Sequence, residues 1–139
     1  MSWDAYIQSL TGADKEGNSY VEEAAICGLE TKSLWANSAN MNITPAEIQK
    51  LLGDRKDFGQ CGTTICGTKC RMLRDNLDTD GMNSLDLKTA PDTEGNTYNI
   101  CIGKTGKTLV IAKGKKDANG GQVATKVFET VSHLKKAQF

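Results

Sequence analysis

The sequence predicts an α+β domain built on an antiparallel sheet, with a helix at each end of the chain. Apolar stripes with a helical period lie near both termini, while alternating apolar and polar residues recur between about residues 61 and 114. Fourteen glycines and only two prolines are spread over 139 residues, a composition typical of short strands joined by tight turns. We expect a single domain, residues 1–139, large enough to bury a real core.

The N-terminal helix is expected to begin at Ser2, whose side chain can cap it, and to stop at Gly12. Its apolar stripe consists of Trp3, Tyr6, Ile7 and Leu10. The next segment, SYVEEAAICGLE at 19–30, fits either a helix or a strand, and its periodicity does not decide between them.

The sequence also predicts the start of a helix in the middle of the chain. Thr44 can cap the helix, Pro45 occupies its first position, and Glu47 completes a capping box. This helix is expected to end near Gly53.

Strands and a final helix follow. Leu85 and Leu87 alternate with polar residues, as do Ile100 and Ile102, which is the pattern of half-buried strands. The turn at 104–107 joins the run that contains Ile100 and Ile102 to the apolar run 108–112. This pair of runs forms a hairpin. After Gly120 and Gly121 a helix is expected, with an apolar stripe made of Val123, Val127, Val131 and Leu134.

Charge is divided unevenly although the net charge is zero. Residues 1–30 hold six acidic side chains and one lysine, whereas residues 104–139 hold eight lysines and two acidic side chains. This asymmetry is compatible with an anionic partner for the C-terminal part, but charge alone favours the alternative, lysines that only solvate a helix face.

The N-terminus lacks the basic and apolar regions of a secretory signal, and no run approaches the roughly 18 apolar residues that span a bilayer. The five cysteines are an odd number, which disfavours a closed disulfide framework. We therefore expect a reduced, cytoplasmic protein.

Two segments imitate ligand-binding motifs without their full requirements. Residues 103–108 resemble a phosphate-binding loop, but a strand follows them and Cys101 stands where the first glycine belongs. Residues 76–81 resemble the start of a calcium loop, but Leu87 stands where the bidentate glutamate belongs. We interpret both as turns.

Cys61, Cys66 and Cys70 lack a fourth donor for zinc, because the single histidine, His133, lies in a distant segment. The sequence also offers no serine elbow and no recognisable acid–base pair. We expect no metal, no cofactor and no enzymatic activity.

Several motifs, taken in order, resemble those of the profilin family, particularly its animal members. The chain opens with Trp3, Tyr6 and Ile7 in the family's W-x-x-Y-aliphatic pattern. Further matches along nearly the whole chain are 42–47, 69–75, 80–81, 104–110, 120–121 and 132–136. The resemblance implies a central antiparallel sheet with both terminal helices on one face and smaller helices on the other.

The resemblance also implies three partners: monomeric actin, proline-rich proteins such as filament nucleators and elongators, and anionic phosphoinositide lipids bound peripherally. It implies a cytoskeleton-associated monomer that has no nucleic-acid partner. For the proline-rich ligand, the matching residues are Trp3, Tyr6, Trp35, His133, Leu134 and Phe139. Aromatic rings can hold the rings of a polyproline II helix, and the Trp3 indole and Tyr6 hydroxyl can donate to its carbonyls.

For actin, the resemblance implies a larger set of residues: Lys69, Arg71, Met72, Arg74, Met82, Lys88, Thr97, Asn99, Gly121, Phe128 and Glu129. For phosphoinositides it implies Lys88, Lys135 and Lys136. Two departures stand out: Phe139 replaces a tyrosine that is common in vertebrate members, and Ala124 and Thr125 replace polar and basic residues.

These residues lead to an expected function and one alternative. The expected function is an actin-monomer-binding protein that promotes nucleotide exchange on actin and delivers subunits to filament ends. The alternative is an adaptor for proline-rich peptides whose actin binding is weak or lost, suggested by Ala124 and Thr125.

Overall fold

The structure is a computed structural model that describes residues 3–13, 17, 19–38, 41–53, 62–77, 79, 82–116 and 118–139. The expected cap at Ser2 lies outside these residues, as does Cys61. Asp78, Asp80 and Gly81, which belong to the calcium-like segment, also lie outside them.

The described strands form one seven-stranded sheet in the order β2-β1-β7-β6-β5-β4-β3, and each neighbouring pair runs antiparallel. The strands are β1 (Val21–Gly28), β2 (Leu34–Asn37), β3 (Thr63–Ile65), β4 (Thr68–Asn76), β5 (Ser84–Thr89), β6 (Asn99–Lys104) and β7 (Thr108–Gly114). This arrangement confirms the predicted α+β class. It also confirms that 103–108 lies where the chain turns from β6 to β7.

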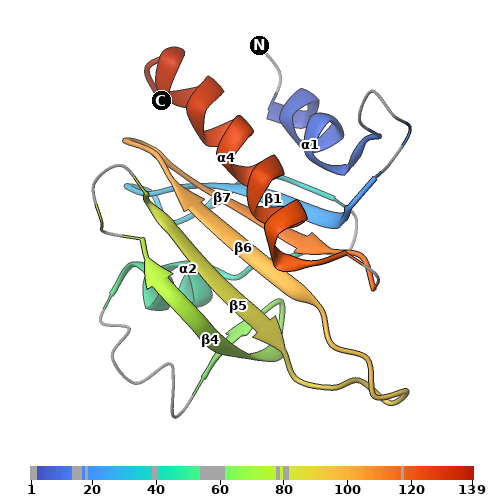
Figure 1. The fold of residues 1–139 in the computed structure, drawn as a ribbon. Coiled ribbons are helices and arrows are strands. Elements are labelled where there is room, and N and C mark those ends of the chain that lie inside the picture. The colour runs from blue at the N-terminus through green and yellow to red at the C-terminus, as the bar shows by residue number, and fades with distance from the viewer. Residues whose placement is uncertain are drawn as a thin grey trace.

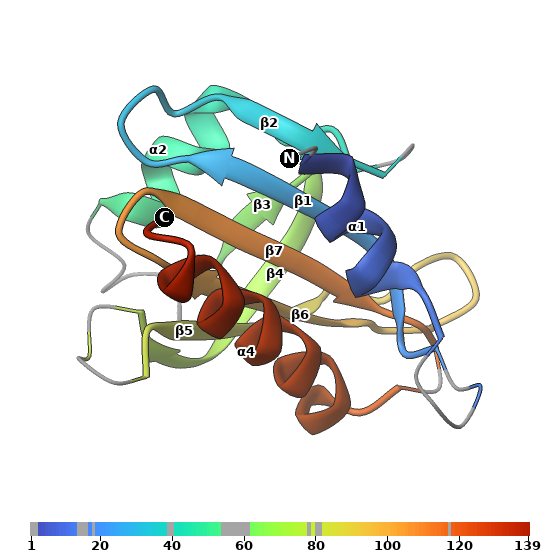
Figure 2. The same cartoon turned by 90° about the horizontal axis from the view of Figure 1, so that it is seen from above.

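Helices cover both faces of the sheet. The terminal helices α1 (Trp3–Thr11) and α4 (Gly120–Lys136) lie on one face, and α2 (Pro45–Leu52) lies on the other, as Figures 1 and 2 show. Each face has its own apolar core. The core under α1 and α4 includes Leu10, Ile26, Val110, Val127 and Leu134, and the core under α2 includes Ile48, Leu51, Leu87, Ile102 and Ile111.

The ambiguous segment at 19–30 is resolved as the inner strand β1. Ala24, Ala25, Ile26 and Cys27 are all completely buried, with successive residues facing opposite cores. A strand that is covered on both faces has no polar face, so its sequence shows no alternation. This is why periodicity could not distinguish it from a helix.

The start of α2 is as predicted. Thr44 Oγ1 accepts from the Glu47 N–H at 3.2 Å, and Glu47 Oε1 accepts from the Thr44 N–H at 3.1 Å. The same carboxylate also accepts from the N–H groups of Cys66 and Gly67 at 3.1 and 3.0 Å. Glu47 therefore joins α2 to the β3–β4 turn.

The last helix begins slightly earlier than predicted, at Gly120 instead of after Gly121. Asn119 caps it, because the Asn119 side chain accepts from the Gln122 N–H at 2.8 Å. The predicted apolar stripe is confirmed, since Val123, Val127, Val131 and Leu134 are all buried.

Gly103 in β6 lets this helix lie close to the sheet. A Cβ atom at Gly103 would be 2.5 Å from Val131 Cγ2 and 2.7 Å from Val127 Cγ1.

Among the described residues, no helix has the length and apolarity that crossing a membrane would require.

Candidate functional site

Four aromatic rings from three separate segments meet, with Trp3 at their centre. The centroid of the Trp3 ring is 5.5 Å from Tyr6, 5.0 Å from Trp35 and 4.9 Å from Phe139, and the pair with Phe139 is edge-on. His133 joins the group through Tyr6, at 5.6 Å between ring centroids. We call Trp3, Tyr6, Trp35, His133 and Phe139 the aromatic cluster.

The terminal helices supply most of these rings. Trp3 and Tyr6 are three residues apart on α1 and therefore share one face of the helix. His133 lies in the last turn of α4, which packs beside α1 on the same face of the sheet (Figure 2). The structure thus brings together five of the six residues that the sequence assigned to a proline-rich ligand.

Phe139 is held in place through its main chain. Its N–H donates to the Leu134 carbonyl at 2.9 Å, and its main-chain oxygen accepts from Thr105 Oγ1 at 2.9 Å and from the Lys107 N–H. The β6–β7 turn therefore fixes the end of α4 so that the Phe139 ring reaches Trp3.

Trp35 reaches the cluster from the edge strand β2. Its ring lies directly over Gly28, where a Cβ atom would come within 2.5 Å of the indole. Trp35 remains 36% exposed, which leaves ring surface available to a ligand. Because Gly28 has no side chain, the Trp35 ring can lie close to β1. Trp35 therefore belongs to this site although it is far from both termini in the sequence.

Leu134 requires a correction, because its side chain is completely buried in the core under α1 and α4. It faces the sheet and cannot touch a ligand on the outer surface, so its part is to support the rings above it. Tyr6 is only 8% exposed, which limits its contact with a ligand to one edge.

A groove continues from the aromatic cluster between α1 and α4. Its volume is about 420 Å³, and Tyr6 and His133 line it at the end that the cluster shares. The other lining residues are Ala5, Ser9, Lys126, Glu129 and Thr130. Unlike the cluster, this groove carries one side chain of each charge, Lys126 and Glu129.

A second hollow lies where the N-terminal half of α4 crosses the sheet. It has a volume of about 350 Å³ and is lined by Arg74, Asn99 and Gly121, all of which the sequence assigned to actin. Lys88 lies between Arg71 and Asn99 in the strand register, so these residues extend the same face of the sheet. We call this area the sheet-side surface.

Apolar side chains continue this surface along α4. Phe128 is 61% exposed and Met82 is 48% exposed, and both line a smaller cavity of about 120 Å³ above Gly103. Exposed apolar side chains that gather in one patch often mark an interaction site. The sheet-side surface therefore combines basic, polar and apolar groups.

Met72 is wrongly placed by the sequence assignment. It pairs with Leu87 and packs against the core on the α2 side, whereas Arg71 lies on the α4 side. A bulge between Met72 and Arg74 shifts the alternation, so that Arg74 returns to the α4 side opposite Asp86.

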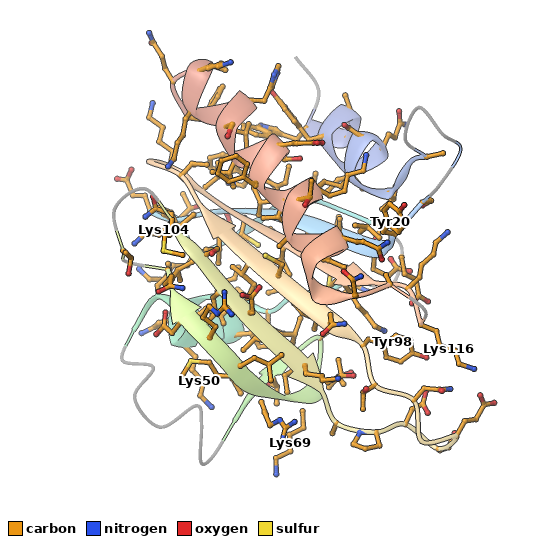
Figure 3. All side chains as sticks on the ribbon, in the orientation of Figure 1. Tyr20, Lys50, Lys69, Tyr98, Lys104 and Lys116 are labelled. Carbon is orange, nitrogen blue, oxygen red and sulfur yellow. The ribbon has the colours of Figure 1, made fainter. Side chains whose placement is uncertain are left out.

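Glu129 is also separated from most of the actin set. It lines the groove between α1 and α4, while Phe128 faces the cavity beside the sheet. Lys69 is exposed at the start of β4 (Figure 3), and Thr97 is half-buried two residues before β6.

Two residues of the sheet-side surface were missed by sequence reasoning. Leu73, 50% exposed, and Asp86 both line the larger hollow. An alternating strand pattern predicts that Asp86 faces away from Leu85, but it cannot place Leu73, because the bulge falls at that position.

The three lysines assigned to phosphoinositides do not form one patch. Lys88 is in register with Asn99, which lies beside the start of α4 near Gly120. Lys135 and Lys136 are in the last turn of this 17-residue helix, about 20 Å further on. Lys135 donates to Asn83 Oδ1 at 3.1 Å.

The buried thiols do not suggest a reactive or metal-binding site. Burial raises the pKa of Cys27 to about 12 and the pKa values of Cys66 and Cys70 to about 11, so these thiols remain protonated at neutral pH. Within the described part of the chain, no three His, Cys, Asp or Glu side chains are grouped as metal ligands.

Comparison with known proteins agrees with this geometry. The family model described as Profilin matches residues 1–139. Human Profilin-1 is 39% identical over 99% of this chain and 98% of its own, and rat Profilin-2 is 33% identical over the same shares.

Solved structures agree as well. Mouse Profilin IIa, solved in complex with a double repeat from the FH1 domain of mDia1, has a TM-score of 0.89 at 33% identity, with both chains covered completely. LokiProfilin1, solved in complex with rabbit actin, has a TM-score of 0.65 at 17% identity, with 96% of this chain and 94% of the other covered, a likeness that shows the shared fold.

Proposed function

This chain belongs to the profilin family, and we propose that it binds proline-rich peptides at the aromatic cluster and monomeric actin at the sheet-side surface. The observation that carries the first activity is the contact of Trp3 with rings from α1, β2 and the C-terminal residue. Mouse Profilin IIa, a relative, was solved with an FH1 repeat bound.

The physical chemistry of the cluster suits a polyproline II helix. Such a helix is already extended in solution, so little conformational entropy is lost when it binds flat rings. The carbonyl groups of a polyproline II helix accept no hydrogen bonds from within the helix, so they are free to accept from a protein. The Trp3 indole N–H can donate to one of them. We therefore infer affinity for proline runs in general, with limited demands on other side chains.

Titration of a proline peptide tests this activity. Trp3→Ala is expected to weaken binding by about thirtyfold or more, because the central ring of an interface contributes most of its energy. Phe128→Ala is the matched control, since it removes an exposed aromatic ring on the other flank of α4. Equal affinities for the unmodified protein and the Trp3 variant would contradict the proposal.

The proposed actin interface uses the sheet-side surface. It offers basic groups at Arg71, Arg74 and Lys88, and an apolar rim at Phe128 and Met82. Binding that favours one conformation of actin would accelerate its nucleotide exchange by shifting conformational populations. By the same proposal the protein acts in the cytoplasm and delivers actin to filament ends.

Release of a fluorescent nucleotide from purified actin tests this second activity. The unmodified protein is expected to accelerate release, and Arg74→Ala combined with Phe128→Ala is expected to remove the effect. No acceleration at an excess of the unmodified protein would instead favour the peptide adaptor. Ala124 motivates that alternative, because its small side chain lines both hollows of the sheet-side surface.

Phosphoinositide binding is proposed at two separate places, around Lys88 and around Lys135 and Lys136. Flexible lysines attract anionic head groups without a fixed geometry. Cosedimentation with vesicles containing phosphoinositides, repeated with Lys88→Ala and with Lys136→Ala, would separate the two places.

A further inference from the structure

We propose that Lys107 gives the aromatic cluster a preference for proline-rich ligands that carry a carboxylate beside the proline run. This inference rests on the proposed proline-rich site and adds a charge requirement to it. It also orients the ligand, with its acidic flank at the Phe139 end of the cluster.

The main chain of Lys107 is fixed against the site. Its N–H donates to the main-chain oxygen of Phe139, and its carbonyl accepts from the Leu29 N–H at 3.0 Å. Thr105 Oγ1, which also donates to the Phe139 oxygen, tightens the same turn. The position of Lys107 relative to the cluster is therefore set by hydrogen bonds from three elements.

The Lys107 ammonium lies at the rim of the cluster. Its Nζ atom is 5.9 Å from the centroid of the Phe139 ring, at the outer limit of a cation–π contact, and the residue is exposed. A proline ring stacked on Phe139 would place the next ligand residue within reach of this ammonium. A carboxylate there would gain an ion pair at the edge of an apolar surface.

The groups around Lys107 reinforce its positive charge. The last turn of α4 adds Lys135 and Lys136, and the base of the β6–β7 turn adds Lys104. The β1–β2 turn, which packs on Lys107, contributes Lys32 and the carboxylate of Glu30. Lysines therefore outnumber side-chain carboxylates among the described residues of these three elements, and the terminal carboxylate of Phe139, which accepts from the Lys107 N–H, adds one main-chain negative charge.

The other end of the cluster has a different character. There Tyr6 and His133 lead into the groove between α1 and α4, where Lys126 and Glu129 oppose each other in charge. An acidic flank gains no net attraction from that groove, whereas at the Phe139 end it meets the ammonium of Lys107. This difference predicts which way a ligand with one acidic flank will lie.

A peptide carboxylate fits Lys107 better than a lipid phosphate does. The ammonium stands beside a ring that a proline would cover, so peptide and charge are recognised at one place.

Three capped peptides test the proposal: a proline run alone, the same run followed by two glutamates, and the same run followed by two glutamines. Acetyl and amide caps remove the charges of the peptide ends. The glutamate peptide is expected to bind about two- to fivefold more tightly than the glutamine peptide at low salt, the range of an exposed ion pair. The difference should shrink at high salt.

Substitutions at Lys107 test whether this residue supplies the positive charge that favours the glutamate peptide. Lys107→Met is expected to abolish the preference for glutamate while leaving the affinity for the plain proline run within about twofold. Lys107→Glu is expected to reverse it. Lys116→Met is the matched control, because Lys116 is an exposed lysine at the opposite end of the sheet from the Lys104 side (Figure 3).

Each outcome is decisive. A glutamate preference that survives in Lys107→Met would overturn the assignment to Lys107, as would a Lys107 effect seen only with phosphoinositide vesicles. If the plain proline run fails to bind the unmodified protein, the proposed proline-rich site fails and this inference fails with it.

Discussion

Phe139 shows how one residue can keep the shape of a site and change its polarity. The phenyl ring packs edge-on against Trp3, so the apolar contact is retained. A phenyl ring has no hydroxyl with which to donate to a ligand carbonyl. At this position the cluster depends on stacking alone, with the Lys107 ammonium 5.9 Å from the ring centroid.

Restoring the hydroxyl should therefore strengthen peptide binding. Phe139→Tyr is expected to tighten the affinity for a plain proline run by about two- to tenfold, the value of one net hydrogen bond. Calorimetric titration measures this, and His133 and Trp3 remain unchanged in the variant. An affinity equal to that of the unmodified protein would mean that no ligand carbonyl lies near the ring edge.

At the scale of elements, Glu47 joins α2 to the β3–β4 turn with a carboxylate. Burial would raise the pKa of Glu47, but the N–H groups of Gly67, Thr44 and Cys66 and the Thr64 hydroxyl stabilise the charged form and lower the pKa overall. A lowered pKa in the folded state means that the carboxylate stabilises the fold above its ordinary pKa of 4.5. This contribution is lost as the pH falls through the lowered value.

Glu47→Gln should reduce stability at neutral pH and flatten its acid dependence. The amide has one carbonyl oxygen, so it cannot satisfy all the donors that the carboxylate satisfies, and we expect a loss of about 1–3 kcal/mol in the free energy of unfolding. Urea unfolding measured between neutral and acidic pH checks this. The difference between the two proteins should narrow toward low pH, and a constant difference would contradict the explanation.

Gly103 controls how closely α4 approaches the sheet. Because an added methyl would be 2.5 Å from Val131 and 2.7 Å from Val127, Gly103→Ala is expected to cost about 1–3 kcal/mol of stability through overpacking. Thermal unfolding measures the cost. Gly67→Ala is the informative comparison, since nothing lies within 4 Å of its added methyl and only its φ of 78° opposes the change.

At the scale of the whole molecule, α4 separates two surfaces. Its buried stripe faces the sheet, His133 lies on the flank toward α1, and Phe128 lies on the flank toward β5 and β6. A rigid helix with two usable flanks allows two partners to bind without competing for the same atoms. Glu129 lines the groove on the α1 side, on the other flank of α4 from Phe128.

The two flanks should therefore respond separately to substitution. Phe128→Ala is expected to weaken actin binding by about tenfold or more while leaving the affinity for proline peptides within about twofold. Trp3→Ala is expected to do the reverse. Separate titrations of each variant with actin and with a proline peptide check the pair, and loss of both activities in either variant would indicate a structural defect.

Much of the molecule was determined by the sequence alone. The capping box at Thr44, the alternation in β5 and the stripe on α4 follow local rules that need no knowledge of distant residues. Aromatic residues near both termini were visible as well. Their assignment to one surface came from the family resemblance, because periodicity places residues on a helix face and does not say which faces meet.

Tertiary structure decided the rest. Burial on both faces accompanies the strand β1, and the bulge in β4 returned Arg74 to the same side of the sheet as Arg71. Packing placed Leu134 beneath the aromatic cluster and Trp35 over Gly28. These outcomes depend on contacts between residues far apart in the chain, and such contacts leave no periodic signal in the sequence.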